Sequence, residues 1–139
     1  MTKAYVIIDE LNWKKKIINL NLYINKKLKI ITKQNKSKKE FTIFLTNNRT
    51  MKKLNFKFRN KKKITDVLSF PLSDKNQKMY LGDIAISYEL IKKRSMKSDF
   101  KKEFDKIWIH GYLHLLGYNH SSFKEYKIMR NKEKKILNK

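Results

Sequence analysis

Apolar residues near the start of the chain recur at spacings of three and four, the period of one face of an α-helix. The stripe comprises Trp13, Ile17, Leu20, Ile24, Leu28 and Ile31. It predicts one long amphipathic helix. Asn12 stands directly before the stripe, where an N-cap side chain accepts a hydrogen bond from the first helical turn.

Four shorter apolar runs are typical of β-strands. They are Tyr5–Ile8, Phe41–Leu45, Val67–Leu72 and Met79–Ile86. Pro71 lies near the end of the third run and has no backbone N–H to donate. That strand is therefore expected at an edge of the sheet.

The remaining periodic segments predict helices between and after the strands. Thr50–Phe58 reads as a short helix, and Ser87 is expected to cap another that reaches about Met96. A longer helix is expected over Asp99–Leu116. Gly117 follows it and suits a left-handed C-terminal stop.

The inward face of that longer helix is expected to form core rather than a base-stacking platform. Its members are Phe100, Phe104, Ile107 and Trp108. Ser122 and Glu125 have the spacing of a capping box that opens a last helix over residues 123–137. Together the segments predict an α/β fold. We expect one domain, residues 1–139, in which about five helices pack a mixed sheet of about four strands.

The composition narrows the compartment and the chemistry. The chain has 139 residues and no cysteine, which excludes disulfides, thiolate metal sites and cysteine nucleophiles. No apolar run approaches the ~18 to 20 residues of a membrane helix. The apolar stretch Ala4–Ile8 is too short for a signal peptide, and Asp9 and Glu10 follow it. A cytoplasmic protein without a membrane partner is therefore expected.

The charge is strongly basic, with 35 Lys and Arg against 12 Asp and Glu, a net charge of +23. Such a balance favours a polyanionic partner, most often nucleic acid. Lys, Asn and Ile are all abundant, and all three are encoded by A/T-rich codons. Mutational bias therefore explains the charge as well as a nucleic-acid partner does. The two explanations are compatible, because a basic surface attracts RNA whatever its origin.

All three histidines of the chain lie within eleven residues, as His110, His114 and His120. The first two are four residues apart on a predicted helix, so their side chains project from one face. Gly117 lets the chain reverse, and His120 then returns toward the same point. Three imidazoles and an open fourth position are typical of a catalytic zinc site at the end of a long helix. Ordinary helix and loop histidines are the weaker alternative.

The same spacing fits the metzincin protease pattern H-E-x-x-H-x-x-G-x-x-H. In those proteases the glutamate after the first histidine is the general base. This chain has Gly111 at that position. The substitution argues against peptide hydrolysis by that mechanism.

Three ordered motifs resemble the YbeY family of bacterial endoribonucleases. Residues 110–120, HGYLHLLGYNH, are similar to the family signature HGxLHLxGYDH. Residues 54–59, LNFKFR, and 65–71, TDVLSFP, resemble its LN-x-x-[FY]-R…TDVLSFP, and residues 81–87, LGDIAIS, resemble its LGDI-x-IS. The chain departs from the signature at Asn119, where the family has Asp. Asn can hydrogen-bond but cannot act as a base.

The resemblance implies a zinc-dependent endoribonuclease that cleaves single-stranded RNA. It also implies a role in maturing ribosomal RNA, notably the 3′ end of the small-subunit RNA, and in ribosome quality control. The implied partners are the small ribosomal subunit and assembly factors such as the GTPase Era. The alternatives are a metzincin-like metalloprotease, or a non-catalytic RNA-binding assembly factor whose histidines hold a structural metal.

Arg59 is the candidate catalytic residue outside the metal ligands. It matches the family's Arg, and a guanidinium offers forked donors that suit a phosphate. Its alternative role is that of a solvated surface cation. Ser69 and Phe70 are expected to line the cleft or to support its wall.

Overall fold

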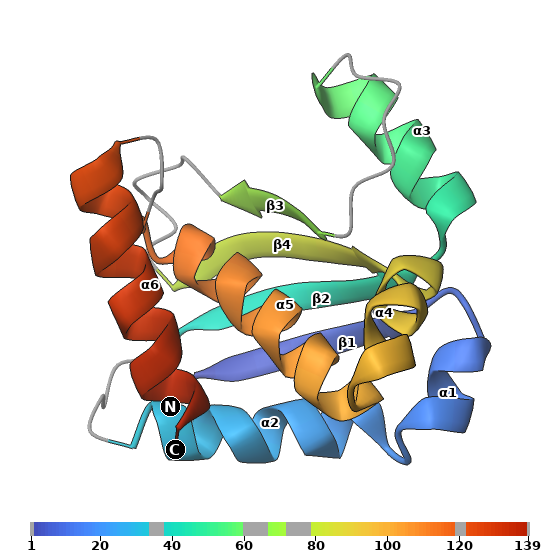
Figure 1. Ribbon diagram of the computed structural model, residues 1–139, viewed down its shortest axis with the longest axis horizontal. Helices are drawn as coiled ribbons and strands as arrows, with labels where there is room; N and C mark the ends of the chain where they lie inside the picture. Colours follow the sequence, from blue (N-terminus) through green and yellow to red (C-terminus); the bar gives the residue numbers. More distant parts are fainter. Residues whose placement is uncertain (1, 34–37, 60–66, 72–78, 119–121, 139) are drawn as a thin grey trace.

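The computed structural model contains one mixed sheet of four strands (Figure 1). It describes residues 2–33, 38–59, 67–71, 79–118 and 122–138, apart from the side chain of Arg59. The strands are β1 (Lys3–Ile8), β2 (Glu40–Thr46), β3 (Val67–Pro71) and β4 (Tyr80–Ser87). Their order in the sheet is β1-β2-β4-β3. Strands β1, β2 and β4 are parallel, while β3 is antiparallel to β4 at the edge. The predicted α/β class and the edge position of the Pro71 strand are confirmed.

Six α-helices surround the sheet in the described part of the chain, where about five were expected. They are α1 (Asn12–Lys16), α2 (Leu20–Ile31), α3 (Asn48–Arg59), α4 (Tyr88–Arg94), α5 (Phe100–Leu115) and α6 (Phe123–Leu137). One turn of 3-10 helix (Ser95–Lys97) follows α4. The N-cap of the predicted capping box is confirmed, because Ser122 Oγ accepts from the Glu125 backbone N–H at 3.1 Å.

The single long helix expected after β1 is wrong, because the chain breaks between α1 and α2. Asn19 adopts the left-handed conformation with φ 51°, and its Oδ1 accepts from the Leu22 backbone N–H at 3.1 Å. Asparagine tolerates this conformation and caps α2 by that bond. Asn12 is the first residue of α1 rather than its N-cap. The apolar stripe survives the break, since Trp13, Ile17 and Leu20 are all buried.

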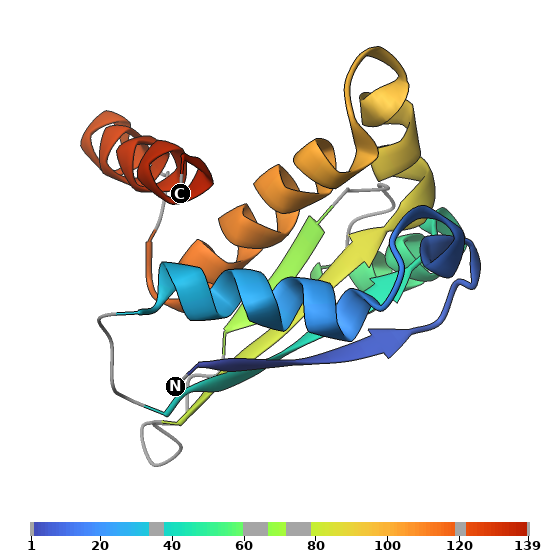
Figure 2. The same cartoon turned by 90° about the horizontal axis from the view of Figure 1, so that it is seen from below.

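The two faces of the sheet are covered unequally. Strand residues that alternate along β2 and β4, such as Ile43 and Ile84, pack into a large core with α2, α4 and α5. Figure 2 shows α2, α5 and α6 together on this side of the sheet. The intervening residues face the other way and join a smaller cluster with Met51 of α3. Alternation along a strand therefore assigns each strand residue to one face.

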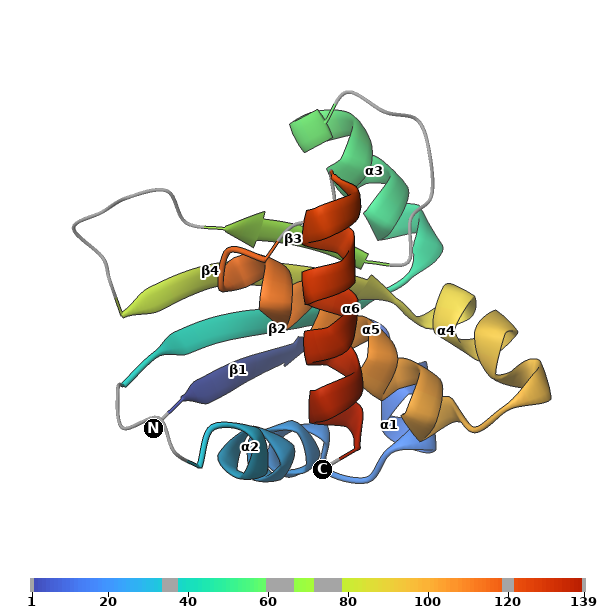
Figure 3. The same ribbon diagram turned by 60° about the vertical axis from the view of Figure 1, so that its left-hand side comes forward.

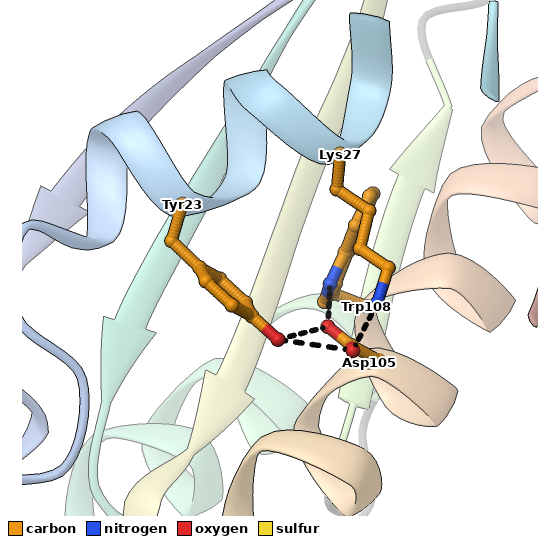
Figure 4. Close-up of polar contacts among 4 residues, drawn as sticks. All are labelled: Tyr23, Lys27, Asp105 and Trp108. Carbon is orange, nitrogen blue, oxygen red and sulfur yellow. Dashed lines mark hydrogen bonds and ion pairs between the residues drawn. The ribbon is translucent and has the colours of Figure 1, made fainter. Parts of the chain in front are cut away.

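The first half of α5 is tied to α2 by a buried carboxylate (Figure 4). Asp105 is 6% exposed and accepts from the Tyr23 hydroxyl and from Trp108 Nε1, each at 3.0 Å. Lys27 Nζ forms an ion pair with it at 2.5 Å. Burial, followed by the charge of Asp105, raises the pKa of Tyr23, so its hydroxyl stays protonated as a donor. Three donors therefore satisfy one buried acceptor group.

No helix in the described ranges combines the length and the apolar character needed to cross a bilayer. The four residues predicted to form the inward face of α5 are all buried, which confirms that this stripe is core.

Replacing Asp105 by Ala should lower the free energy of unfolding by about 3 kcal/mol, because the Lys27 ammonium and the Trp108 N–H lose their acceptor. Tyr23→Phe removes one neutral donor and should cost about 1 kcal/mol. Denaturant titration measures both. Asp99→Ala is the matched control, since Asp99 is exposed and its side chain caps nothing. Equal midpoints for Asp105→Ala and Asp99→Ala would show that the network does not stabilise the fold.

Candidate metal centre

Two of the three histidines meet on α5 as their spacing predicts. His110 Nε2 and His114 Nε2 are 3.1 Å apart, and the two rings lie nearly perpendicular, at 81°. Both side chains are partly exposed, with the His110 side chain 29% accessible. The pair therefore presents two ring nitrogens toward one point that solvent reaches.

Each histidine is held by a hydrogen bond at its other ring nitrogen. His110 Nδ1 lies 2.6 Å from the Glu133 carboxylate of α6, which packs against α5 (Figure 3). His114 Nδ1 lies 3.0 Å from the Tyr118 carbonyl oxygen. A carbonyl and a carboxylate only accept hydrogen bonds, so both Nδ1 atoms carry the proton. In neutral imidazoles the lone pairs are then on the two Nε2 atoms that face each other.

The end of α5 supplies the carbonyl that orients His114. Gly117 has φ +102°, the Tyr118 N–H donates to the Leu113 carbonyl at 3.0 Å, and the Gly117 N–H donates to the His114 carbonyl at 3.0 Å. This is the hydrogen-bond pattern of a Schellman motif. Because the chain reverses there, the Tyr118 carbonyl points back at the preceding turn. The predicted glycine stop is confirmed, and it has a second role as part of the site.

The face of α5 next to the histidines approaches the sheet so closely that a side chain at position 111 would force its neighbours to shift. A Cβ at Gly111 would lie 3.0 Å from Ile84 Cγ2 and 3.2 Å from Ser69 Oγ. Ser69 Oγ also donates to the Gly111 carbonyl at 3.3 Å. A glutamate here, as in the protease pattern, would have to enter the packed boundary between α5 and the sheet. The local packing thus gives a physical reason for glycine at this position.

Among the described residues, no other predicted site residue lies beside His110 and His114. His120 and Asn119 lie outside the described residues. Arg59 is the last residue of α3, and Figure 1 shows that end of α3 apart from the C-terminal end of α5. Ser69 supports the wall of the site through Gly111, whereas Phe70 faces the opposite side of the sheet with the α3 cluster.

Glu133 is the residue that the sequence did not reveal. It lies 23 positions after His110, on a helix with many charged residues, and no motif marks it. Carboxylates that accept from the second nitrogen of a metal-binding imidazole fix its orientation and raise its basicity. Only the packing of α6 against α5 shows that Glu133 is in this position.

The spacing of the two ring nitrogens fits a metal ion, while the described residues alone form no group of three ligands around it. Two imidazole nitrogens bound to tetrahedral zinc at ~2.0 to 2.1 Å are about 3.3 Å apart, close to the 3.1 Å between the two Nε2 atoms. The fold and the site therefore define an α/β protein with a candidate histidine metal centre on the helix that packs against its sheet.

Comparison with known proteins identifies the family within this class. The family described as Endoribonuclease YbeY matches residues 5–139. A curated relative from Pelagibacter ubique, named Endoribonuclease YbeY, is 44% identical and covers 96% of this chain and 92% of its own length. A relative of the same name from Buchnera aphidicola subsp. Acyrthosiphon pisum is 38% identical over 88% of the chain and 81% of its own length.

The solution structure of TM1509 from Thermotoga maritima is similar in fold, with a TM-score of 0.67 and 27% identity. The match covers 99% of this chain and 87% of that one. The chain belongs to the YbeY endoribonuclease family. The resemblance drawn from the three sequence motifs is confirmed.

Gly111→Ala should lower the free energy of unfolding by about 2 kcal/mol, because the added methyl group overpacks the boundary with the sheet. Ile84→Val removes Cδ1, one of the crowding atoms. In the wild type, Ile84→Val should lower the free energy of unfolding by roughly 1 kcal/mol. In the Gly111→Ala protein the same substitution should cost less. Denaturant titration of the four proteins in this cycle measures the coupling. Strictly additive losses would contradict the close approach. Gly117→Ala, whose Cβ would meet nothing within 4 Å, serves as a control for backbone strain alone.

Proposed function

We propose that this protein is a zinc-dependent endoribonuclease that cleaves single-stranded RNA. The observation that carries the proposal is the convergence of two Nε2 lone pairs 3.1 Å apart, each fixed by a hydrogen bond at Nδ1. Membership of a family whose curated members are named endoribonucleases supports the reaction class. In this proposal His110, His114 and His120 hold the ion, one per chain.

The residues of the chain prepare the site for phosphodiester cleavage. Glu133 and the Tyr118 carbonyl hold both imidazoles in the tautomer that places a lone pair on each Nε2, the atom that would bind a cation. Zinc, when bound, supplies Lewis-acid stabilisation of charge on a phosphoryl oxygen and a lowered pKa for water. The attacking oxygen comes from water or from the substrate's own 2′-hydroxyl. In this proposal the three histidines fill three positions of a tetrahedral ion, and the fourth position is open to substrate.

The charge of the chain suits a polyanionic substrate. A net charge of +23 raises the local concentration of RNA and speeds its encounter with the protein. We further propose a cytoplasmic role in ribosomal RNA maturation, at the 3′ end of the small-subunit RNA, and in ribosome quality control. The small ribosomal subunit and assembly factors such as Era are the proposed partners. These roles follow from the family resemblance.

Loss of one ligand should abolish both metal binding and cleavage. His114→Ala should contain far less than one zinc per chain by elemental analysis, and it should leave labelled single-stranded RNA intact. Wild-type cleavage should stop with chelator and return with added zinc, and casein should not be cleaved. Glu103→Ala on the same helix is the matched control and should keep metal and activity. Equal metal content in His114→Ala and wild type would refute the ligand assignment.

Arg59 is proposed to bind a phosphate of the reacting RNA, which requires the strand to reach from the histidine pair to the end of α3. If that phosphate gains charge in the transition state, Arg59→Ala should lower turnover by about 10² to 10³-fold, the effect of removing one charge-stabilising donor. RNA affinity should change far less, because many lysines share the nonspecific contacts. Single-turnover rates at saturating RNA separate the two effects. Lys53→Ala, an exposed cation on the same helix, is the control. A similar small effect in both variants would leave Arg59 as one solvated cation among several.

A further inference from the structure

The face of the sheet opposite α5 carries apolar and aromatic side chains in two rows. The strand register aligns Ile7, Phe44, Ala85 and Leu68 in one row, and Tyr5, Thr42, Asp83 and Phe70 in the next. We call this surface the open face. Neighbouring strands are about 4.8 Å apart, so each row spans the whole sheet.

A groove of about 580 Å³ lies between the open face and α3. Its lining includes Ile7, Phe44, Leu54, Phe58, Phe70 and Asp83. The Phe58 and Phe70 rings meet edge to face, with centroids 5.4 Å apart. The groove therefore combines one wall from the sheet with a second wall from the aromatic side of the helix.

Large apolar side chains in and beside the groove remain in contact with water. Phe58 is 58% exposed, Ile7 is 54% exposed and Tyr5 is 44% exposed. Single exposed apolar residues are ordinary, but a contiguous group around a groove marks an interaction site. Aromatic rings on a sheet or in a groove are also the platform on which bases of single-stranded nucleic acid stack.

The charge around the groove selects a polyanion as its occupant. Helix α3 carries five cations, Arg49, Lys52, Lys53, Lys57 and Arg59, and no acidic residue. Lys57 Nζ lies 5.4 Å from the centroid of the Phe58 ring, so a cation stands beside the exposed aromatic. A ligand that matches both features has planar apolar groups and a negative backbone. Single-stranded RNA has both.

Asp83 is the acidic residue in the groove lining, and the Tyr80 hydroxyl donates to its carboxylate. It is the register partner of Phe70. A carboxylate in this position repels phosphate, but it can accept from the amino group of a base stacked on the neighbouring ring. Asp83 is thus compatible with bases directed into the groove and phosphates directed toward α3.

A second copy of this chain is disfavoured as the occupant by electrostatics. Two molecules that each carry a net charge of +23 repel one another when their cationic helices approach. RNA is instead attracted to this surface, because its phosphates neutralise the lysines and release bound counterions.

The edge strand β3 connects the groove with the candidate metal centre. Ser69 points to the α5 side, where it donates to the Gly111 carbonyl next to His110. Phe70, the next residue, points into the groove. Successive residues of a strand face opposite sides, so one short edge strand borders both sites. An RNA strand that crosses this edge can touch the groove and the histidine pair together.

We propose that the groove between α3 and the open face is a stacking site for bases of single-stranded RNA, with Phe58 and Phe70 as its platform. The proposal rests on the proposed ribonuclease function, since it names a second binding site for the same substrate. Bases held in the groove are those that flank the cleaved bond. The lysines of α3 contact the adjoining phosphates.

The test compares a labelled 12-nucleotide single-stranded RNA with an abasic strand of the same length. The abasic strand keeps every phosphate but has no base to stack. The full-length His114→Ala protein is used as the background, so that RNA is not cleaved and affinity is the readout. We expect the RNA with bases to bind roughly tenfold or more tightly than the abasic strand, as stacking of one to two bases allows.

Phe58→Leu with Phe70→Leu should remove that preference, because leucine keeps the apolar bulk but not the ring. The salt dependence of binding should stay unchanged, since the phosphate contacts remain. Phe123→Leu is the matched control, an exposed phenylalanine on α6 away from the groove. Thermal unfolding checks that all variants are folded.

Three outcomes would overturn the proposal. The first is equal affinity of the His114→Ala protein for the two strands. The second is a preference that survives the double Leu substitution, which would place stacking elsewhere. The third is self-association in sedimentation experiments that the double substitution abolishes, which would make the groove a contact between copies. Because binding is measured without cleavage, failure of the ribonuclease proposal and failure of this one give different results.

Discussion

The contact that the site depends on is the close approach of α5 to the sheet at Gly111. A Cβ there would be 3.0 Å from Ile84 Cγ2 and 3.2 Å from Ser69 Oγ, so the helix is fixed both in distance and in rotation. With 3.6 residues per turn, His110 and His114 then lie about 60 to 100° round the helix from the face that meets the sheet. That rotation turns both imidazoles toward solvent and toward α6. A larger residue at this position would force Ile84, Ser69 or the helix itself to shift.

Polar contacts around α5 also hold the helix in position. At its first half, Asp105 ties the helix to α2 through Tyr23 and Lys27. Near its end, Glu133 and the Tyr118 carbonyl each accept a hydrogen bond from one Nδ1–H. Buried and partly buried polar groups stabilise a fold only when their partners are present, so these contacts also define the position of the helix. The same helix is therefore part of the core, a partner of α6 and the carrier of the two histidines.

The unequal covering of the sheet leaves a second candidate binding surface on the molecule. The α5 side contains the large core, while the described residues on the other side form a small cluster around Met51. The aromatic residues left near that cluster are bordered by the cations of α3 rather than by further apolar packing. The edge strand β3 is shared by both sides. The proposed groove and the candidate metal centre are thereby linked through a strand of five residues.

The sequence by itself determined the features that depend on local periodicity. The four strands, the Ser122 cap and the i, i+4 histidine pair follow from spacing, and the edge position of the Pro71 strand follows from the missing N–H of proline. Each is found in the fold. The break at Asn19 was missed because the apolar stripe continues across it, and a left-handed residue leaves no mark on such a pattern. Tertiary structure alone decided that Glu133 meets His110, that Gly111 faces Ile84, and that Arg59 ends a helix on the other side of the sheet. These relations join residues far apart in the chain, and they arise from how the helices pack on the sheet, which no local pattern encodes.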